Sequence, residues 1–376
     1  QQFTLHDRQV TIVRTPFLFA KRWPSLKHNE DRDIDPVTQN WAARLADLLF
    51  VPKGYIRWLP YALAQAIPLA RQADVILTFN NPITHHLIGL ALKRLTGTPW
   101  VAEFRDAIVG YRYTKRGPEA INQILERTIV HHADRVIELG DVIAASAATR
   151  YPHLPPAHFT CVPVAGYDPD TFANYTSLPG PDPHGPLLLT YTGSFYGSDI
   201  VPTHILQGLA CAVEQYGVTP DQIQLRFAGD WADKYDRLIE ELHLGPYITY
   251  LGRVTFEACM ALWAESDLLL LLLGEDTATL HLIPFKLWDY IAARRPILAL
   301  VPAASRVASI VQQYRFGSVV EPTGISQIAA VLAELARNKQ QGHTFVQLDE
   351  AAVQAMSCVP GEEQVAATLA AAVAGQ

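Results

Sequence analysis

The sequence predicts an α/β protein built from two doubly wound domains. Short apolar runs alternate with amphipathic segments along most of the chain, as expected for parallel sheets that helices cover on both faces. The length of 376 residues favours two domains, and a hydrophobic content of 49% is enough for two large cores. A stretch rich in proline and glycine, residues 175–186, is the expected linker between them.

The first domain is expected to span residues 1–174. Strands are predicted over residues 9–13, 74–79, 99–104, 134–138 and 158–163. The segments between the later strands predict helices over residues 83–96, 118–132 and 141–150. Residues 21–60 are hard to place, and their charged part, residues 27–35, is expected to be an exposed loop.

The second domain is expected to span residues 187–345 and repeats the same alternation. Its predicted strands lie near residues 187–193, 223–228, 247–251, 267–273, 297–301 and 317–320. Its predicted helices lie near residues 203–216, 231–243, 255–265, 285–294, 304–314 and 325–338. Residues 346–376 are expected to be helical, and residues 365–374 form an alanine-rich terminal helix.

Composition excludes several classes of function. A net charge of −7 argues against non-specific binding of nucleic acid, which needs clustered lysine and arginine. The most apolar run, residues 268–273, is far too short to cross a bilayer, and no signal peptide is visible. The scattered cysteines indicate a reducing compartment rather than a disulfide frame or a zinc site; they are Cys161, Cys211, Cys259 and Cys358. We therefore expect a cytoplasmic protein, and peripheral contact with the inner face of the membrane stays open.

The most informative segment is residues 281–300. It reads as a loop, a helix from about Pro284, and a buried strand from Ile297. The first amides of a helix have no partners within it, so a helix behind a strand offers an anion site. Lys286 adds a positive charge, and Asp289 lies on the same face three residues later. This pairing suits the phosphates and hydroxyls of a nucleotide sugar, although a plain loop with a solvated lysine and aspartate has the same pattern.

The same segment resembles a Pro-Ser-Lys signature of family 4-like glycosyltransferases, which have the GT-B fold. Further segments resemble that family in the same order, among them Pro99-Trp-Val-Ala-Glu-Phe-Arg-Asp106 and Val162-Pro-Val-Ala-Gly-Tyr-Asp-Pro169. The other matching segments are residues 74–82, 85–90, 125–127, 133–137, 189–194, 227–229 and 250–253. The resemblance covers about residues 8–345 and implies two Rossmann-like domains that face a central cleft.

The resemblance also implies an activity. Such a protein transfers a sugar from a nucleoside-diphosphate sugar to an acceptor hydroxyl, with retention of configuration and without a metal or other cofactor. The acceptor would be a saccharide, a lipid-linked sugar or a small molecule, as in the assembly of polysaccharides or glycolipids. In this family a strand, a Gly-rich loop and a helix precede the strand at residues 9–13. No such unit is visible, so we expect it to be absent or missing from the N-terminus. The last helices are expected to cross back to the first domain.

The second domain is expected to bind the donor nucleotide sugar at the ends of its strands. The candidate residues there are Gly193, Ser194, Gly229, Arg253, Leu282, Ile283, Lys286 and Asp289. The glycines are equally consistent with tight turns, and Arg253 with a helix cap. Relative to the family, residues 194–199 lack the usual cations, so Lys286 is expected to carry more of the phosphate charge.

Three further departures concern the segment around Lys286. Phe285 replaces a serine, Asp289 replaces a glutamate, and His281 stands where many members have a glutamate. His281 is a candidate catalytic residue that could contact the donor, although a single loop histidine is more often only exposed.

The first domain is expected to supply the acceptor side and the remaining catalytic groups. Arg105 and Asp106 end one strand, and Asp106 could orient or deprotonate an acceptor hydroxyl. A structural pair between Arg105 and Asp106 is the competing interpretation. Asn80 and Asn81, together with Thr84, end an earlier strand and could contact the acceptor or the sugar.

No metal site is predicted. Neighbouring histidines on a helix point about 100° apart and cannot chelate one ion together, so His85/His86 and His131/His132 are expected to be surface histidines of helices. Two other functions remain open on the same fold. One is a nucleotide-sugar epimerase, which needs no acceptor, and the other is a degenerate homologue that binds a sugar nucleotide without catalysis.

Overall fold

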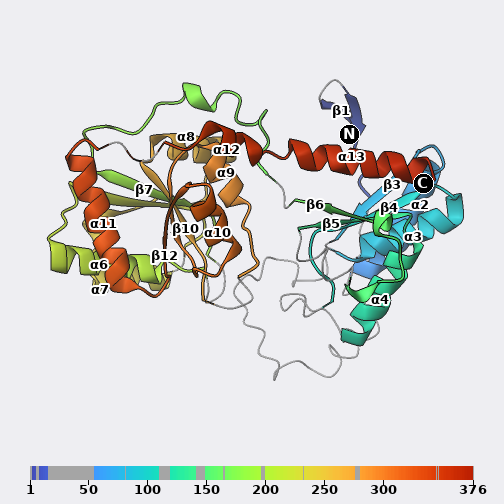
Figure 1. Cartoon of the computed structure of the whole chain (residues 1–376), viewed down its shortest axis with the longest axis horizontal. Helices are drawn as coiled ribbons and strands as arrows, with labels where there is room; N and C mark the ends of the chain where they lie inside the picture. The colour runs from blue at the N-terminus through green and yellow to red at the C-terminus, as the bar shows by residue number, and fades with distance from the viewer. Residues whose placement is uncertain are drawn as a thin grey trace. The chain divides into compact units, whose positions relative to one another are not determined.

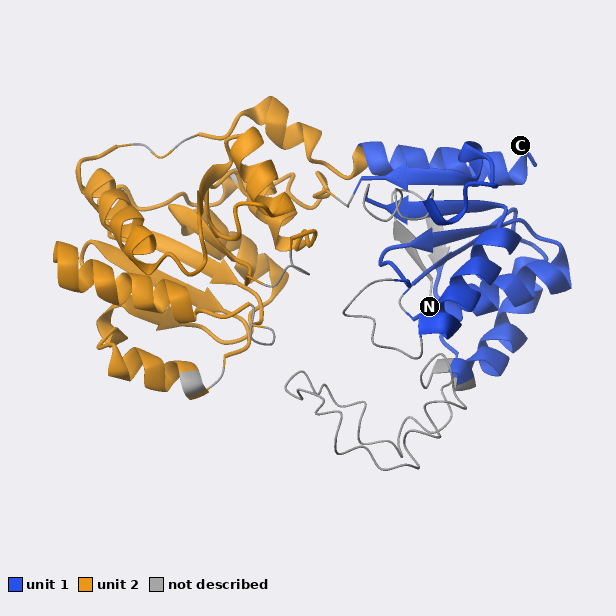
Figure 2. Ribbon diagram, turned by 60° about the horizontal axis from the view of Figure 1, so that its bottom comes forward, with its two compact units in different colours: residues 1–164, 360–376 blue, residues 165–359 orange. Residues whose placement is uncertain are grey.

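The computed structural model describes residues 2–5, 8–15, 55–80, 82–109, 119–140, 149–163, 166–195, 200–231, 233–275, 280–343, 345 and 347–375. The chain divides into two compact units, one of residues 1–164 and 360–376 and the other of residues 165–359 (Figure 2). The expected linker, residues 175–186, lies within the second unit and contains a short 3-10 helix, η5 (Tyr175–Ser177). Each unit has its own parallel sheet (Figure 1).

The sheet of unit 1 is parallel and has the order β3-β4-β5-β6. Its strands are β3 (Ile76–Phe79), β4 (Trp100–Phe104), β5 (Arg135–Leu139) and β6 (Phe159–Val162). The helices α2 (Leu59–Ala70), α3 (Thr84–Thr96) and α4 (Glu119–His132) belong to the same unit, with the 3-10 helices η3 (Tyr55–Trp58) and η4 (Pro156–His158). All four strands and two of the three helices predicted for this region are found, and most of the third, residues 141–148, lies outside the described residues.

Two features of unit 1 differ from the sequence expectations. The strand β2 (Arg8–Thr11) pairs with β1 (Gln2–Leu5) in an antiparallel hairpin that is separate from the parallel sheet. The helix α2 is absent from the predictions because two prolines, at its start and at position 68, obscure its periodicity. The charged stretch 27–35 lies outside the described residues.

The terminal helix α13 (Val359–Val373) packs on the sheet of unit 1, although almost 200 residues of the second unit precede it (Figure 2). Its apolar side chains meet Val101, Ile137 and Val162, which are buried on three neighbouring strands. The hydroxyl of Thr368 donates a hydrogen bond of 3.0 Å to Thr160 on β6. The end of the chain is therefore part of the core of unit 1.

The sheet of unit 2 is also fully parallel, in the order β12-β11-β10-β7-β8-β9. Its strands are β7 (Leu187–Thr192), β8 (Ile223–Ala228), β9 (Ile248–Tyr250), β10 (Leu268–Leu272), β11 (Ile297–Leu300) and β12 (Gly317–Val320). Its helices are α6 (Thr203–Tyr216), α7 (Asp233–Glu241), α8 (Phe256–Glu265), α9 (Lys286–Ala292), α10 (Arg306–Gln313), α11 (Ile325–Gln340), α12 (Glu350–Ala355) and the 3-10 helix η6 (Gly245–Tyr247). The strand order reverses at β7, which lies between β10 and β8, as in a doubly wound fold.

Alternate residues along the strands of unit 2 face its largest core. Leu187, Leu189 and Tyr191 of β7 belong to one cluster with side chains of α6 and α11. The strand β10 is buried on both faces over all five leucines, as expected for a central parallel strand. Asp267 immediately precedes that strand and forms a buried ion pair of 2.5 Å with Lys339 of α11. This core fixes the positions of the strand ends that carry the candidate site.

Candidate donor site at the strand ends of unit 2

Three glycines follow three neighbouring strands of unit 2 and form one surface. Gly193, Gly229 and Gly252 follow β7, β8 and β9, with φ values of 125°, 146° and 70°. The amide of Gly193 donates to the carbonyl of Ala228, and the amide of Gly229 donates to the carbonyl of Gly252. A Cβ atom on Gly229 would lie 2.1 Å from the carbonyl oxygen of Gly193. Only glycine fits there, because the two loops touch backbone to backbone.

Lys286 points at this glycine surface from the first residue of α9. A Cβ atom on Gly193 would lie 2.7 Å from its Nζ atom, and the same ammonium lies 3.9 Å from the ring centroid of Tyr191. Among the described residues, no carboxylate pairs with Lys286. Burial lowers the pKa of Lys286 to about 7. The aromatic ring supports the cation only weakly, so a bound anion would be its natural partner.

Asp289 lies one turn after Lys286 and is half-buried. Burial raises the pKa of its carboxyl to about 6. In the part of the chain that the structure describes, its side chain has no hydrogen-bond donor, and the thiol of Cys259 on α8 is close enough to feel its charge. A partly dehydrated carboxylate without a donor is suited to accept hydrogen bonds from ligand hydroxyls.

The helix α9 itself contributes less to an anion site than expected. It has seven residues, and two of its first amides already have acceptors. The amide of Leu287 donates to the carbonyl of Pro284, and the amide of Trp288 donates to that of Phe285. The charge of Lys286, rather than a row of free amides, is therefore the main attraction for an anion here.

Ser194 and Arg253 are joined through a carboxylate that was not among the predicted site residues. The hydroxyl of Ser194 donates a hydrogen bond of 2.7 Å to Asp230, and the guanidinium of Arg253 pairs with both oxygens of the same carboxylate. The side chain of Arg253 is 71% exposed. Arg253 thus reaches solvent at the rim of the glycine surface with its charge largely compensated by Asp230.

Aromatic rings support this surface from below and beside it. Phe195 stacks on Tyr191 with 4.9 Å between centroids, and Trp231 contacts both Phe195 and Tyr250. The hydroxyl of Tyr250 donates to the carbonyl of Gly229. The alternation along β7 indicates that Tyr191 is a core residue, but no sequence signal places its ring beneath Lys286.

The remaining predicted residues of the donor site lie just before α9. His281 is exposed, Leu282 and Ile283 are half-buried, and Phe285 is 68% exposed. The structure gives no contact that joins His281 to Lys286 or Asp289, so its catalytic role stays a prediction.

At the ends of β3 and β4 in unit 1, Arg105 pairs with Glu103 and not with Asp106. The guanidinium of Arg105 donates to Glu103 at 2.7 Å and lies 4.2 Å from the ring centroid of Phe79. The side chain of Asn80 is buried and binds the backbone of residues 105 and 106 through both its oxygen and its nitrogen. Asn80 therefore positions Asp106 and has little capacity left for an acceptor.

Three other predictions for unit 1 concern Asn81, Thr84 and His86. Asn81 lies outside the described residues. Thr84 is fully buried, and its hydroxyl has no partner among the described residues, so it does not face an acceptor. His86 was expected on the surface but is fully buried, because it packs against Phe104 and bonds Thr78 on the inner face of β3. Burial lowers the pKa of His86 to about 3.

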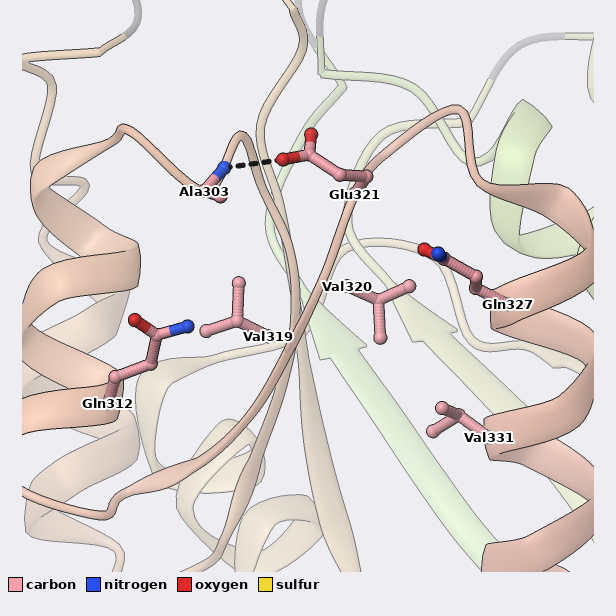
Figure 3. Close-up of a pocket in the computed structure, with 7 residues that line it drawn as sticks. All are labelled: Ala303, Gln312, Val319, Val320, Glu321, Gln327 and Val331. Atoms are coloured by element: carbon pink, nitrogen blue, oxygen red, sulfur yellow. Dashed lines mark hydrogen bonds between the residues drawn. The ribbon is translucent and has the colours of Figure 1, made fainter.

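A separate pocket lies at the edge strand β12, with a volume of about 330 Å³ (Figure 3). Valines of β12 and α11 line it, together with two glutamines and Glu321, which binds the amide of Ala303. None of its lining residues belongs to the candidate donor site.

Comparisons with known proteins bear on the first domain and on the fold. Residues 6–165 match the model of the glycosyl transferase 4-like domain. No curated protein matches the sequence of the chain. Among solved structures, α,α-trehalose 6-phosphate synthase of Burkholderia multivorans superimposes with a TM-score of 0.60 at 14% identity, over 85% of this chain and 76% of that chain.

Two further solved structures are similar. HepE of Anabaena in complex with UDP-glucose has a TM-score of 0.53 at 16% identity, over 83% of this chain and 82% of that one. Sucrose-phosphate synthase of Thermosynechococcus elongatus has a TM-score of 0.52 at 15% identity, over 87% and 81%. These likenesses confirm the predicted GT-B fold. The first part of the chain is thus similar to a glycosyl transferase 4-like domain, and the chain as a whole has the GT-B fold.

Proposed function

We propose that this chain, with its glycosyl transferase 4-like domain and GT-B fold, transfers a sugar from a nucleoside-diphosphate sugar to an acceptor hydroxyl. The observation that carries the proposal is Lys286, whose ammonium lies against the glycine surface at the end of β7 and has no carboxylate partner among the described residues. A diphosphate placed there would supply the missing negative charge, and Asp289 would accept hydrogen bonds from the ribose.

The proposed mechanism is retaining and needs no metal ion, as the resemblance implies. The chain would contribute positioning and electrostatic stabilisation of the leaving diphosphate. Lys286 supplies the charge, and the backbone at Gly193 allows close approach of the phosphate because the residue has no Cβ atom. Arg253 and His281 remain secondary contacts in this proposal, because Asp230 already pairs with Arg253 and His281 is exposed.

The proposed acceptor side is the end of β4 in unit 1. Asp106 would orient the acceptor hydroxyl, held in place by Asn80 through the backbone of residues 105 and 106. Arg105 would lie beside it with its charge balanced by Glu103. The acceptor is a saccharide, lipid-linked sugar or small molecule in this proposal. Among the described residues, no helix is both long and apolar enough to span a bilayer.

The first test is a calorimetric titration with UDP-glucose, GDP-mannose, ADP-glucose and dTDP-glucose, followed by product assays with mixed acceptors. UDP-glucose is the first choice because the similar HepE structure contains it. We expect one donor to bind, and Lys286→Met to lose at least tenfold in affinity, about 1.4 kcal/mol. Lys93→Ala serves as the matched control, because Lys93 pairs with Asp134 in unit 1.

The two other functions give different results in the same experiment. Conversion of the donor without an acceptor would indicate an epimerase. Donor binding without any product would indicate a non-catalytic sugar-nucleotide-binding protein. Two observations favour this alternative: Asp230 already pairs with Arg253, and residues 194–199 contain no lysine or arginine. Equal binding by the unaltered chain and Lys286→Met would contradict the proposed donor site.

A further inference from the structure

Two histidines from different segments of unit 1 meet at the surface, away from the residues discussed so far. His131 lies in the last turn of α4, and His153 lies in the loop that leads to η4. Their Nε2 atoms are 2.8 Å apart, while their ring centroids are 5.0 Å apart with an interplanar angle of 29°. Because the ring centroids are much farther apart than the two Nε2 atoms, the rings do not overlap face to face. They lie nearly in one plane, with one Nε2 atom facing the other.

The other nitrogen of His131 fixes its tautomer. Its Nδ1 atom lies 2.7 Å from the carbonyl oxygen of Arg127, which can only accept, so Nδ1 carries the hydrogen. The Nε2 atom of His131 therefore presents a lone pair to His153. A backbone carbonyl that holds one ring nitrogen is the usual support of a metal-binding histidine, because it orients the ring and makes the free nitrogen more basic.

The surroundings favour a cation and leave room for water. Both side chains are exposed, and His131 lies at the carboxyl end of a helix of 14 residues, where the backbone carbonyls attract positive charge. With metal–nitrogen distances of about 2.0–2.1 Å, two ligands at a right angle lie about 2.9 Å apart. The observed 2.8 Å is close to that spacing.

We propose that His131 and His153 form a surface site for a divalent transition-metal ion of the kind that imidazoles bind, such as Ni²⁺, Cu²⁺ or Zn²⁺. The ion takes the place of the hydrogen shared by the two Nε2 atoms. That proton is lost from Nε2 of His153 while Nδ1 of the same ring takes up a proton from solvent, so both imidazoles stay neutral, and the exposed rings rotate to direct both lone pairs at the ion. No third histidine, cysteine or carboxylate joins them in the described part of the chain, so water completes the coordination. The bound ion links the end of α4 to the loop at residues 151–154.

The test is a calorimetric titration of the whole chain with Ni²⁺, on protein without an affinity tag. We expect one site, whose affinity falls by about tenfold or more in both His131→Gln and His153→Gln, because each variant loses one of two ligands. His132→Gln is the matched control, since His132 lies on the same turn but faces Arg94. Repeating all titrations in a Cys161→Ser background removes the exposed thiol.

A second readout separates the site from scattered binding to single side chains. Ni²⁺ should raise the melting temperature of the unaltered chain and of His132→Gln, but not that of His153→Gln, because only a linked pair of segments resists unfolding. Equal affinity in the unaltered chain and His153→Gln, or an equal loss in His132→Gln, would overturn the proposal.

Discussion

At the residue scale, the candidate donor site depends on two side chains whose burial moves their pKa values toward each other. The pKa of Lys286 falls to about 7, and that of Asp289 rises to about 6, with burial as the cause in both. The lysine is charged below pH 7, and the aspartate is charged above pH 6. Both charges are present together only in a narrow range.

Donor affinity should therefore pass through a maximum between about pH 6 and pH 7. A rising pH removes the ammonium that binds the diphosphate, and a falling pH protonates the carboxylate that accepts from the ribose. A nucleotide sugar is the right probe, because its phosphates are diesters and do not titrate in this range. In Lys286→Arg the alkaline limb should disappear, since arginine stays charged. An unchanged alkaline limb in that variant would assign it to another group.

The glycine surface gives a second prediction at this scale. Gly229→Ala should destabilise unit 2 and abolish donor binding, because its Cβ atom would meet the backbone of Gly193, which cannot move aside. Gly217→Ala is the control: it also has a positive φ, of 65°, but its Cβ atom meets nothing within 4 Å. It should cost only the strain of the left-handed conformation, about 1–2 kcal/mol. Urea unfolding of both variants distinguishes strain from collision.

At the scale of the elements, β5 carries a buried carboxyl group that affects the stability of unit 1. Glu138 is 3% exposed, and one of its carboxyl oxygens has no partner among the described residues. Burial raises its pKa to about 8; the charge of Arg150 opposes this shift, and Glu126 of α4 adds to it. Glu126 itself is held by Arg150 and Tyr151.

Unit 1 should therefore lose stability as the pH rises. Because the pKa of Glu138 is raised in the folded protein, its neutral form is favoured there. Its contribution to the free energy of unfolding is complete below the unfolded pKa of 4.5 and is lost as the pH rises through about 8. Hydrogen exchange of the amides of β5 at pH 6 and pH 9 measures this loss. Glu138→Gln should remove most of the difference between the two pH values, whereas Glu103→Gln, whose carboxylate is paired with Arg105, should not.

At the scale of the whole molecule, the chain closes unit 1 with its last helix. Ala372 of α13 is 4% exposed in the core against the sheet, whereas its neighbour Val373 is 48% exposed. Ala372→Asp should place an unpaired charge in this core and lower the stability of unit 1 by several kcal/mol. Val373→Asp should have little effect.

The readout is the unfolding of each unit by itself. Each has its own core, so two transitions are expected, and only that of unit 1 should move in Ala372→Asp. A loss of stability in unit 2 of the same size would show that the units unfold as one.

The fold class and most strand positions follow from the amino-acid sequence alone, because alternation of buried runs and amphipathic helices is a local property of the chain. The sequence also indicated Lys286 and Asp289, because three residues on a helix place two side chains on one face. The surroundings of these two side chains, by contrast, come from the packing of the folded chain. The ring of Tyr191 beneath Lys286 and the ion pair of Asp230 with Arg253 both depend on how strands and loops distant in sequence pack. The burial of His86 and the meeting of His131 with His153 have the same origin, since contacts between separate segments leave no periodic signal in a single sequence.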